Sequence, residues 1–247
     1  MPIASQITDF SQITAVILAG GFGTRLKKVI SDRHKVMAEI DSKPFLYYLL
    51  DQLTKLHVKR VIVSTGYMAN TVEDYIGRSY KSLHVDYSKE KTPLGTGGAL
   101  RLAGQIIDTK HCLVMNGDSY TEYDPVSLFM AHKQKNANIT ILVKAVDDTT
   151  RFGIIQMNEQ NEIIRFMKKG KTTDSRLINA GIYMMKASAL QKIPGKIPCS
   201  LEYDFFPAMI GKGIYSYETL GRFIDIGTPE SYTHAENFFG IKSGVST

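Results

Sequence analysis

The feature that most constrains this chain is an apolar run, residues 13–18, that leads directly into a glycine-rich turn, residues 19–24. The run has the β-branched, apolar character of a buried strand. Glycines in such a turn leave backbone N–H groups uncovered, so phosphate oxygens can approach them closely. A turn of this kind can also be a plain connection between two elements. Strand and turn together predict a loop that is able to bind an anion.

Two cations follow the strand. Arg25 ends the turn with a planar, permanently charged group that suits a triphosphate. Lys35 is a second cation that can reach the same phosphates. No Gly-Lys-Ser/Thr follows, which excludes a Walker A loop, and Leu26 stands where a dinucleotide fingerprint needs its third glycine. The sequence therefore favours a nucleotide site of a third kind.

Composition limits the class of protein. With 247 residues, 43% of them hydrophobic and 22% charged, the chain is expected to form a globular protein. No apolar run reaches the roughly 20 residues of a membrane span, and the first residues lack the pattern of a secretory signal. The two cysteines, Cys112 and Cys199, are far apart in the sequence, and Cys112, which lies in an apolar run, is expected to be a reduced core residue. We therefore expect a cytoplasmic protein with no membrane partner.

The net charge of +6 raises the question of nucleic-acid binding. The basic residues are spread along the chain, and the sequence shows no basic helix, no RNP-like aromatic pattern and no zinc-ligand spacing. A mild basic excess also suits a pocket that holds several phosphates. We expect no nucleic-acid partner.

The first half of the chain alternates strand-like and helix-like segments. The expected strands are residues 13–18, 60–65, 83–87 and 112–115, and the expected helices are residues 45–57, 69–78 and 97–107. Such alternation predicts an α/β fold with a doubly wound, mostly parallel Rossmann-like sheet, whose ligands bind at the carboxyl ends of the strands.

The second half has a different pattern. Strands are expected at residues 139–146, 153–157 and 163–166, and helices at residues 201–210 and 229–239. Tight turns between these strands predict a smaller antiparallel region beside the parallel sheet. No linker or repeat divides the chain, so we expect one domain over residues 13–242, an N-terminal extension over 1–12 and a tail over 243–247.

Two aspartates are candidates for holding a hard cation. Asp118 follows the expected strand at residues 112–115, and glycine before it permits close approach, although Asn-Gly-Asp is also a common plain turn. Asp225 lies between Ile224 and Ile226 in a strand-like run. A buried carboxylate is costly without a partner, so Asp225 needs either a cation or the backbone N–H groups of the following Gly-Thr turn.

A second glycine turn, at residues 93–98, opens the expected helix at 97–107. It can be a simple strand-to-helix connection with Thr96 as the cap.

These motifs together resemble the sugar-1-phosphate nucleotidyltransferases, also called nucleotide-sugar pyrophosphorylases. The resemblance starts from LAGGFGTRL at residues 18–26, Lys35 with the run VMAEI, and Lys43-Pro44-Phe45, and it extends to about Phe239. The form Pro-Leu-Gly-Thr-Gly-Gly at residues 93–98 is most similar to guanylyltransferases that act on mannose or heptose sugars.

The resemblance implies a GT-A-like fold and a specific reaction. The expected activity is transfer of a nucleoside monophosphate from GTP to D-glycero-D-manno-heptose 1-phosphate or mannose 1-phosphate, with release of pyrophosphate. Mg²⁺ is the implied cofactor, held by Asp118 and Asp225. The implied product feeds polysaccharide synthesis, such as capsule or lipopolysaccharide, and the implied oligomeric state is a monomer or homodimer.

The resemblance also assigns roles to residues. Catalytic roles fall on Arg25, Lys35, Asp118 and Lys168. Nucleotide-binding roles fall on Leu18, Ala19, Gly20, Gly21, Gly23, Thr24, Arg25, Leu94, Gly95, Thr96, Gly97, Asn116 and Gly117. Sugar-phosphate-binding roles fall on Gly153, Lys168, Asn179, Gly181 and Glu202. The chain departs from the family at Met167, where a glutamate is usual, and at His34, where a proline is usual.

Other classes compete with this interpretation. Uridylyl-, adenylyl- and cytidylyltransferases share most of the motifs. A GT-A-type glycosyltransferase should carry Asp-X-Asp after a strand, where this chain has Asn116-Gly117-Asp118. A molybdopterin guanylyltransferase lacks the later motifs around Asn179 and Glu202. A non-catalytic regulatory subunit would lose the charged residues that this chain keeps.

Overall fold

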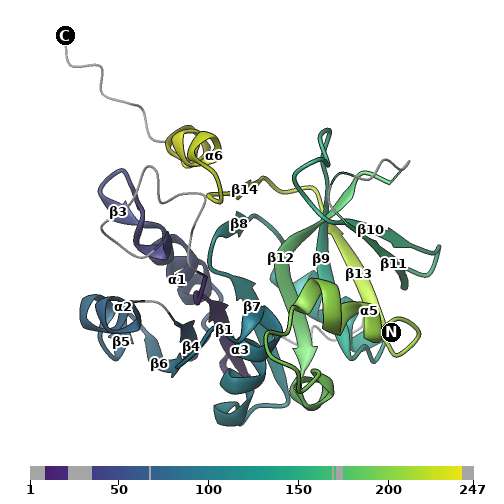
Figure 1. The fold of residues 1–247 in the computed structure, drawn as a ribbon, viewed down its shortest axis with the longest axis horizontal. Coiled ribbons are helices and arrows are strands. Elements are labelled where there is room, and N and C mark those ends of the chain that lie inside the picture. The colour runs from purple at the N-terminus through teal and green to yellow at the C-terminus, as the bar shows by residue number, and fades with distance from the viewer. Residues whose placement is uncertain (1–8, 22–34, 67, 169, 171–174, 241–247) are drawn as a thin grey trace, which may run out of the picture.

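The computed structural model describes residues 9–21, 35–66, 68–168, 170 and 175–240. Its centre is a sheet of ten strands (Figure 1). Along the main path the order is β11, β10, β12, β7, β1, β4, β6, β5, and β9 pairs with both β12 and β13. In chain order the strands are β1 Ile13–Leu18, β4 Arg60–Thr65, β5 Ser79–Tyr80, β6 Leu83–Lys89, β7 His111–Asn116, β9 Ile139–Ala145, β10 Ile154–Met157, β11 Ile163–Met167, β12 Leu177–Lys186 and β13 Ile214–Thr219.

The predicted parallel sheet is confirmed in the first half of the chain. β7, β1, β4 and β6 are neighbours and run parallel. The register places Leu18, the last residue of β1, beside Asn116, the last residue of β7. The backbone N–H of Gly117 then donates to the Leu18 carbonyl over 2.9 Å. The first glycine turn and the Asn-Gly-Asp segment therefore lie side by side at the carboxyl edge of the sheet.

The predicted antiparallel region is also present, but it belongs to the same sheet. β12 is antiparallel to β7, β9 and β10, so it joins the two halves of the chain. One pair departs from the expectation, because β13 runs parallel to β9. β12 was not among the strands expected from the sequence, and neither were β5 and β13. In β12, Asn179 and Gly181 interrupt the apolar run, and Gly181 has φ of +76°.

The helices cover both faces of the sheet. They are α1 Phe45–Lys55, α2 Ala69–Ile76, α3 Gly95–Ala103, α4 Pro125–Gln134, α5 Phe206–Ala208, α6 Pro229–Thr233 and α7 Ala235–Phe238. The 3₁₀ turns are η1 Phe10–Gln12, η3 Lys35–Met37, η4 Gly104–Ile106 and η5 Ala187–Lys192, and η6 Leu201–Phe205 is a π-helical turn. Two short ribbons complete the described structure, β2 Glu39–Ile40 with β3 Lys43–Pro44, and β8 Ser119–Thr121 with β14 Phe223–Asp225.

Three of the expected helices have different forms, and the one expected at residues 229–239 is divided at His234 into α6 and α7. The helix expected at residues 201–210 is the π-helical turn η6 followed by one α-turn, because Pro207 near the start of α5 has no N–H to donate to a continuous ladder. The helix expected at residues 97–107 begins earlier, at Gly95, and ends in the 3₁₀ turn η4. Among the described helices, none is long and apolar enough to cross a bilayer.

The core lies on both faces of the central strands. Successive residues of β1 alternate between faces, so Ala15 and Ile17 pack with the buried leucines of α1, whereas Val16 packs with Leu100 and Ala103 of α3. Cys112 is buried and unpaired, as the sequence predicted, and so is Cys199. Phe10, in the predicted N-terminal extension, is buried in the first of these clusters. The domain boundaries themselves stay predictions.

A buried histidine gives the fold a pH-dependent stability. His132 on α4 is 1% exposed, and its Nδ1 lies 2.9 Å from the Thr140 hydroxyl. Burial, with a smaller effect of His111 and Lys186, lowers the pKa of His132 from 6.5 to about 3. The folded chain thus binds this proton only at much lower pH than the unfolded chain does. The resulting stability is complete above the unfolded pKa of 6.5 and is lost as pH falls toward 3.

We expect His132→Gln to reduce this pH dependence. From pH 6.5 down to about pH 5, the wild-type free energy of unfolding should fall by about 2 kcal/mol on account of this group alone. Urea titrations at both pH values measure the slope, and His57→Asn, at an exposed histidine, is the control. Equal slopes in wild type and His132→Gln would contradict the assignment.

Candidate active site

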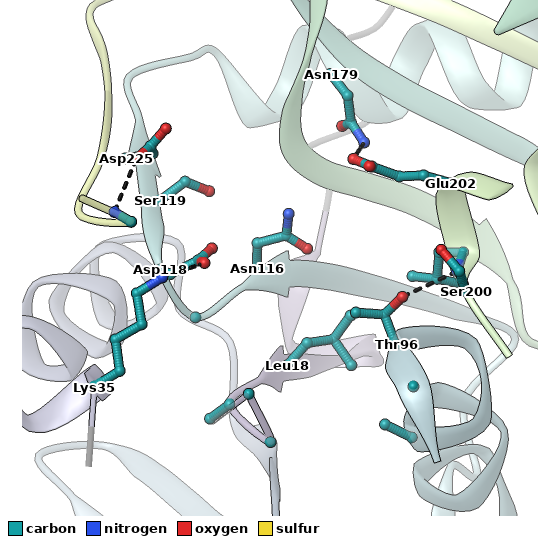
Figure 2. A pocket seen from close by; sticks show the side chains of 18 of the residues that line it. Leu18, Lys35, Thr96, Asn116, Asp118, Ser119, Asn179, Ser200, Glu202 and Asp225 are labelled. Carbon is teal, nitrogen blue, oxygen red and sulfur yellow. Dashed lines mark hydrogen bonds and ion pairs between the residues drawn. The ribbon is translucent and has the colours of Figure 1, made fainter. Parts of the chain in front are cut away.

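A cleft of about 500 Å³ opens at the carboxyl ends of β1 and β7 (Figure 2). It collects site residues that the sequence analysis drew from segments far apart in the chain. Those in its lining are Leu18, Ala19, Gly20, Gly21, Lys35, Gly95, Thr96, Asn116, Gly117, Asp118, Asn179, Glu202 and Asp225. Its position agrees with the rule that open α/β sheets bind ligands at the carboxyl ends of their strands.

Lys35 and Asp118 form an ion pair in this cleft. Lys35 lies on η3 and Asp118 directly follows β7. Lys35 Nζ donates to Asp118 Oδ2 over 2.6 Å, with the lysine side chain 12% and the aspartate side chain 46% exposed. The cation is therefore held inside the cleft, while the carboxylate stays open to a ligand.

The second carboxylate lies next to the first. Antiparallel pairing of β14 with β8 places Asp225 opposite Ser119, and the N–H of Ile226 donates to the Asp118 carbonyl over 2.9 Å. Ile224 and Ile226 are buried, and the Asp225 side chain is 19% exposed. The predicted meeting of two aspartates more than a hundred residues apart is thus a consequence of this two-stranded ribbon.

Asp225 has the donors that its burial requires. The N–H of Gly227 donates to Asp225 Oδ1 over 2.8 Å, as the turn-based alternative foresaw. A cation is also present, because the guanidinium of Arg151 forms an ion pair with Asp225 at 3.1 Å. Arg151 was not among the site residues expected from the sequence, although Arg151 directly precedes the Phe152-Gly153 pair. The contact spans 74 residues, which no local pattern could reveal.

The donor set fits Mg²⁺ chemically. Within the described residues, no three His, Cys, Asp or Glu side chains form a metal-binding group. A Mg²⁺ that enters with a nucleotide needs only one or two carboxylates, because phosphate oxygens and water complete its six ligands. Asp118 and Asp225, which both line the cleft and carry hard oxygen donors, could supply these ligands.

Two glycine turns form the wall assigned to the nucleotide, and Glu90 joins them. Its Oε2 accepts the N–H of Leu94 over 2.8 Å, and a Cβ added to Gly20 would lie 2.1 Å from its Oε1. A side chain at position 20 would therefore displace this carboxylate. Burial raises the pKa of Glu90, partly offset by the Leu94 hydrogen bond. Glu90 lines the cleft and was not among the residues expected there.

The second glycine turn wraps around the backbone of Cys199. The N–H of Gly97 donates to the Cys199 carbonyl over 2.8 Å, and the Leu94 carbonyl accepts the Cys199 N–H over 2.8 Å. Leu94 and Gly97 thus shape the turn, whereas Gly95 and Thr96 line the cleft. Thr96 is not the helix cap, because its hydroxyl instead accepts the N–H of Leu201 over 2.9 Å.

The opposite wall carries the residues assigned to the sugar. Asn179 Nδ2 donates to Glu202 Oε1 over 2.9 Å and to the Tyr183 hydroxyl over 3.0 Å. Gly181 lies behind this wall, and a Cβ there would be 2.4 Å from Ser119 Oγ. Because Gly181 has no side chain, there is room for the Ser119 hydroxyl next to it.

A smaller pocket of about 120 Å³ adjoins this wall. Asn179 and Glu202 line both spaces, so the two are contiguous. Gly153 and Lys168 line the smaller pocket rather than the main cleft, as does Met167, where the family usually has a glutamate. Four predicted positions, Gly23, Thr24, Arg25 and His34, lie outside the described residues.

The pattern that defines the nucleotidyl transferase family matches residues 14–240. This chain therefore belongs to the nucleotidyl transferase family. It is 34% identical to D-glycero-alpha-D-manno-heptose 1-phosphate guanylyltransferase of Aneurinibacillus thermoaerophilus, a match that covers 90% of this chain and 96% of that enzyme. It is 31% identical to mannose-1-phosphate guanylyltransferase of Mycobacterium tuberculosis, of which it spans 63%.

A solved structure gives the same result. HddC from Yersinia pseudotuberculosis, crystallised with GMP-PN, superimposes with a TM-score of 0.80 at 34% identity, covering 92% of this chain and 99% of that one. The predicted family and the Rossmann-like, mostly parallel fold are therefore confirmed.

Proposed function

We propose that this chain is a sugar-1-phosphate guanylyltransferase, which transfers GMP from GTP to a manno-configured sugar 1-phosphate and releases pyrophosphate. The observation that carries the proposal is the convergence of two glycine turns, the Lys35–Asp118 pair and Asp225 in one cleft. The identity to a heptose 1-phosphate guanylyltransferase over nearly its whole length supports the choice of base and sugar.

The reaction needs no nucleophile from the protein. An oxygen of the sugar 1-phosphate attacks the α-phosphorus of GTP in line, the new P–O bond forms, and the bond to pyrophosphate breaks. Catalysis then rests on positioning and on stabilisation of charge. Lys35 neutralises charge that develops at the α-phosphate. Arg25 and the first glycine turn hold the β- and γ-phosphates, and Lys168 orients the attacking phosphate.

Asp118 and Asp225 are the residues that would hold Mg²⁺. When bound, the ion supplies charge neutralisation on the phosphate oxygens. The glycine turn at residues 94–97 would contact the guanine, and Asn179 and Glu202 would bind sugar hydroxyls from the opposite wall.

Sugar choice rests on the second wall. We propose D-glycero-D-manno-heptose 1-phosphate or mannose 1-phosphate, with the product used in synthesis of a surface polysaccharide such as capsule or lipopolysaccharide. Met167 replaces a carboxylate beside Lys168 in the smaller pocket, so this pocket has one fewer acceptor for sugar hydroxyls. The proposed setting is the cytoplasm, and the proposed assembly is a monomer or homodimer.

Pyrophosphate release with Mg²⁺ tests the proposal. GTP, ATP, UTP, CTP and dTTP are each combined with mannose, heptose and glucose 1-phosphates. We expect kcat/KM for GTP with a manno-configured sugar to exceed the other pairs by roughly tenfold or more. Preference for another base or sugar would correct the substrate. No turnover with any pair, from folded protein, would overturn the proposed activity in favour of a non-catalytic subunit.

A further inference from the structure

The Nη2 atom of Arg151 has more hydrogen-bond acceptors within reach than it can donate to. This atom lies 3.1 and 3.3 Å from the two carboxylate oxygens of Asp225, 3.3 Å from the Thr228 hydroxyl and 3.4 Å from the Ser231 hydroxyl. An NH₂ group donates only two hydrogen bonds. The Thr228 and Ser231 hydroxyls already bond each other and backbone N–H groups in the capping box of α6, so the guanidinium is held by several long contacts, of which only those to Asp225 join opposite charges.

The two aspartates assigned to the metal are each balanced by a cation of the chain, whereas Glu90 and Glu202 line other parts of the cleft. Lys35 pairs with Asp118 at 2.6 Å and Arg151 pairs with Asp225 at 3.1 Å, so the four side chains carry no net charge. The two pairs are adjacent, because a Cβ added to Gly227 would lie 2.9 Å from Asp225 Oδ1 and 3.6 Å from Lys35 Nζ. A divalent ion that enters alone would leave two uncompensated positive charges there.

The guanidinium of Arg151 also has space to move away from Asp225. Arg151 lies in the connection between β9 and β10, its side chain is 38% exposed, and its guanidinium packs 5.6 Å from the ring of Phe152. Phe152 in turn contacts Phe223 at the start of β14. The guanidinium thus already packs beside an aromatic pair at the edge of the cleft, and it can turn from Asp225 into the cleft, which both Arg151 and Phe152 line.

We infer that Arg151 is a resident counter-ion of Asp225 that competes with the divalent metal and gives way to it only when a nucleotide brings negative charge into the cleft. This inference rests on the metal role assigned to Asp225 under the proposed function. Arg151 is thus a positioning residue that makes metal binding depend on nucleotide. The displaced guanidinium is then available to a phosphate oxygen in the same cleft.

Mn²⁺ binding to nucleotide-free protein tests this inference without any reaction. Free Mn²⁺ is measured by its EPR signal during titration of EDTA-treated wild type, Arg151→Gln, Arg151→Met and Arg151→Lys. Removing a unit charge a few ångströms from the ion should lower the Mn²⁺ Kd roughly tenfold or more in the two neutral variants. Arg151→Lys, which keeps the charge, should remain within about twofold of wild type.

Two controls separate the possible failures. Arg176→Gln removes an arginine that pairs with the fully exposed Asp147 outside the cleft, and it should leave the Kd unchanged. Asp225→Asn should abolish the tightened binding in the Arg151→Gln background. An unchanged Kd in both neutral variants would overturn the counter-ion role and leave the proposed function standing. No Mn²⁺ binding in any variant, with or without GTP, would overturn the metal assignment itself.

Discussion

Replacing Lys35 by alanine is expected to lower kcat by about a hundredfold or more, as removal of other charge-stabilising groups does. The lysine side chain is 12% exposed and held by Asp118 at 2.6 Å, so its position is fixed before substrate arrives. A fixed charge needs little reorganisation during the reaction, which is why its loss should act on kcat more than on KM. Pyrophosphate release under saturating GTP and sugar 1-phosphate measures the effect.

Lys43→Ala is the matched control for this experiment. Lys43 also forms a lysine–aspartate pair, with Asp51 at 2.5 Å, but it does not line the cleft. We expect kcat of this variant to stay near that of wild type. If Lys35→Ala retained kcat within about threefold of wild type, the role assigned to Lys35 would be wrong.

Replacing Gly95 by alanine is expected to reduce stability by about 3 kcal/mol or more and to remove GTP binding. Gly95 has φ of +75°, and an added Cβ would lie 2.5 Å from the Cys199 carbonyl oxygen. That carbonyl accepts the N–H of Gly97, so it cannot move without opening the turn. Thermal unfolding and GTP titration measure the two effects.

Gly77→Ala separates backbone strain from the steric clash. Gly77 has nearly the same φ, +73°, but an added Cβ would meet nothing within 4 Å. Because its ψ of −156° places it in a region that only glycine readily adopts, the variant should cost about 2 kcal/mol, which in a chain of this size lowers the Tm by roughly 6 °C, and it should bind GTP normally. Equal Tm shifts in the two variants would contradict the clash with Cys199.

The parallel half of the fold could be predicted because its signals are local. Residues 13–18 and 60–65 are continuous apolar and β-branched runs, and the structure gives both strands those same bounds. β12 carries no such signal, since Asn179 and Gly181 interrupt its apolar run for reasons that concern the cleft. The strand that unites the two halves of the sheet was therefore among those that the sequence did not reveal, together with β5 and β13.

The residues of the site also fall into two groups, those with a local sequence signal and those without one. Lys35, Asp118 and Asp225 could be assigned because each belongs to a motif with neighbours of fixed type. Arg151 and Glu90 contact partners that only the fold brings near. Arg151 pairs with Asp225, and Glu90 contacts the two glycine turns. Their residue types alone predict nothing more than a charged surface.

The ribbon of β8 and β14 has a consequence for synthesis of the protein. A chain that has grown only to Thr219 already holds all ten strands of the main sheet, which end with β13. It does not yet hold Asp225, whose strand pairs with β8 outside that sheet. A nonsense mutation between these points would thus delete the second carboxylate while leaving the coding sequence of every strand of the main sheet, so the strands and the complete site are encoded by separable stretches of the gene.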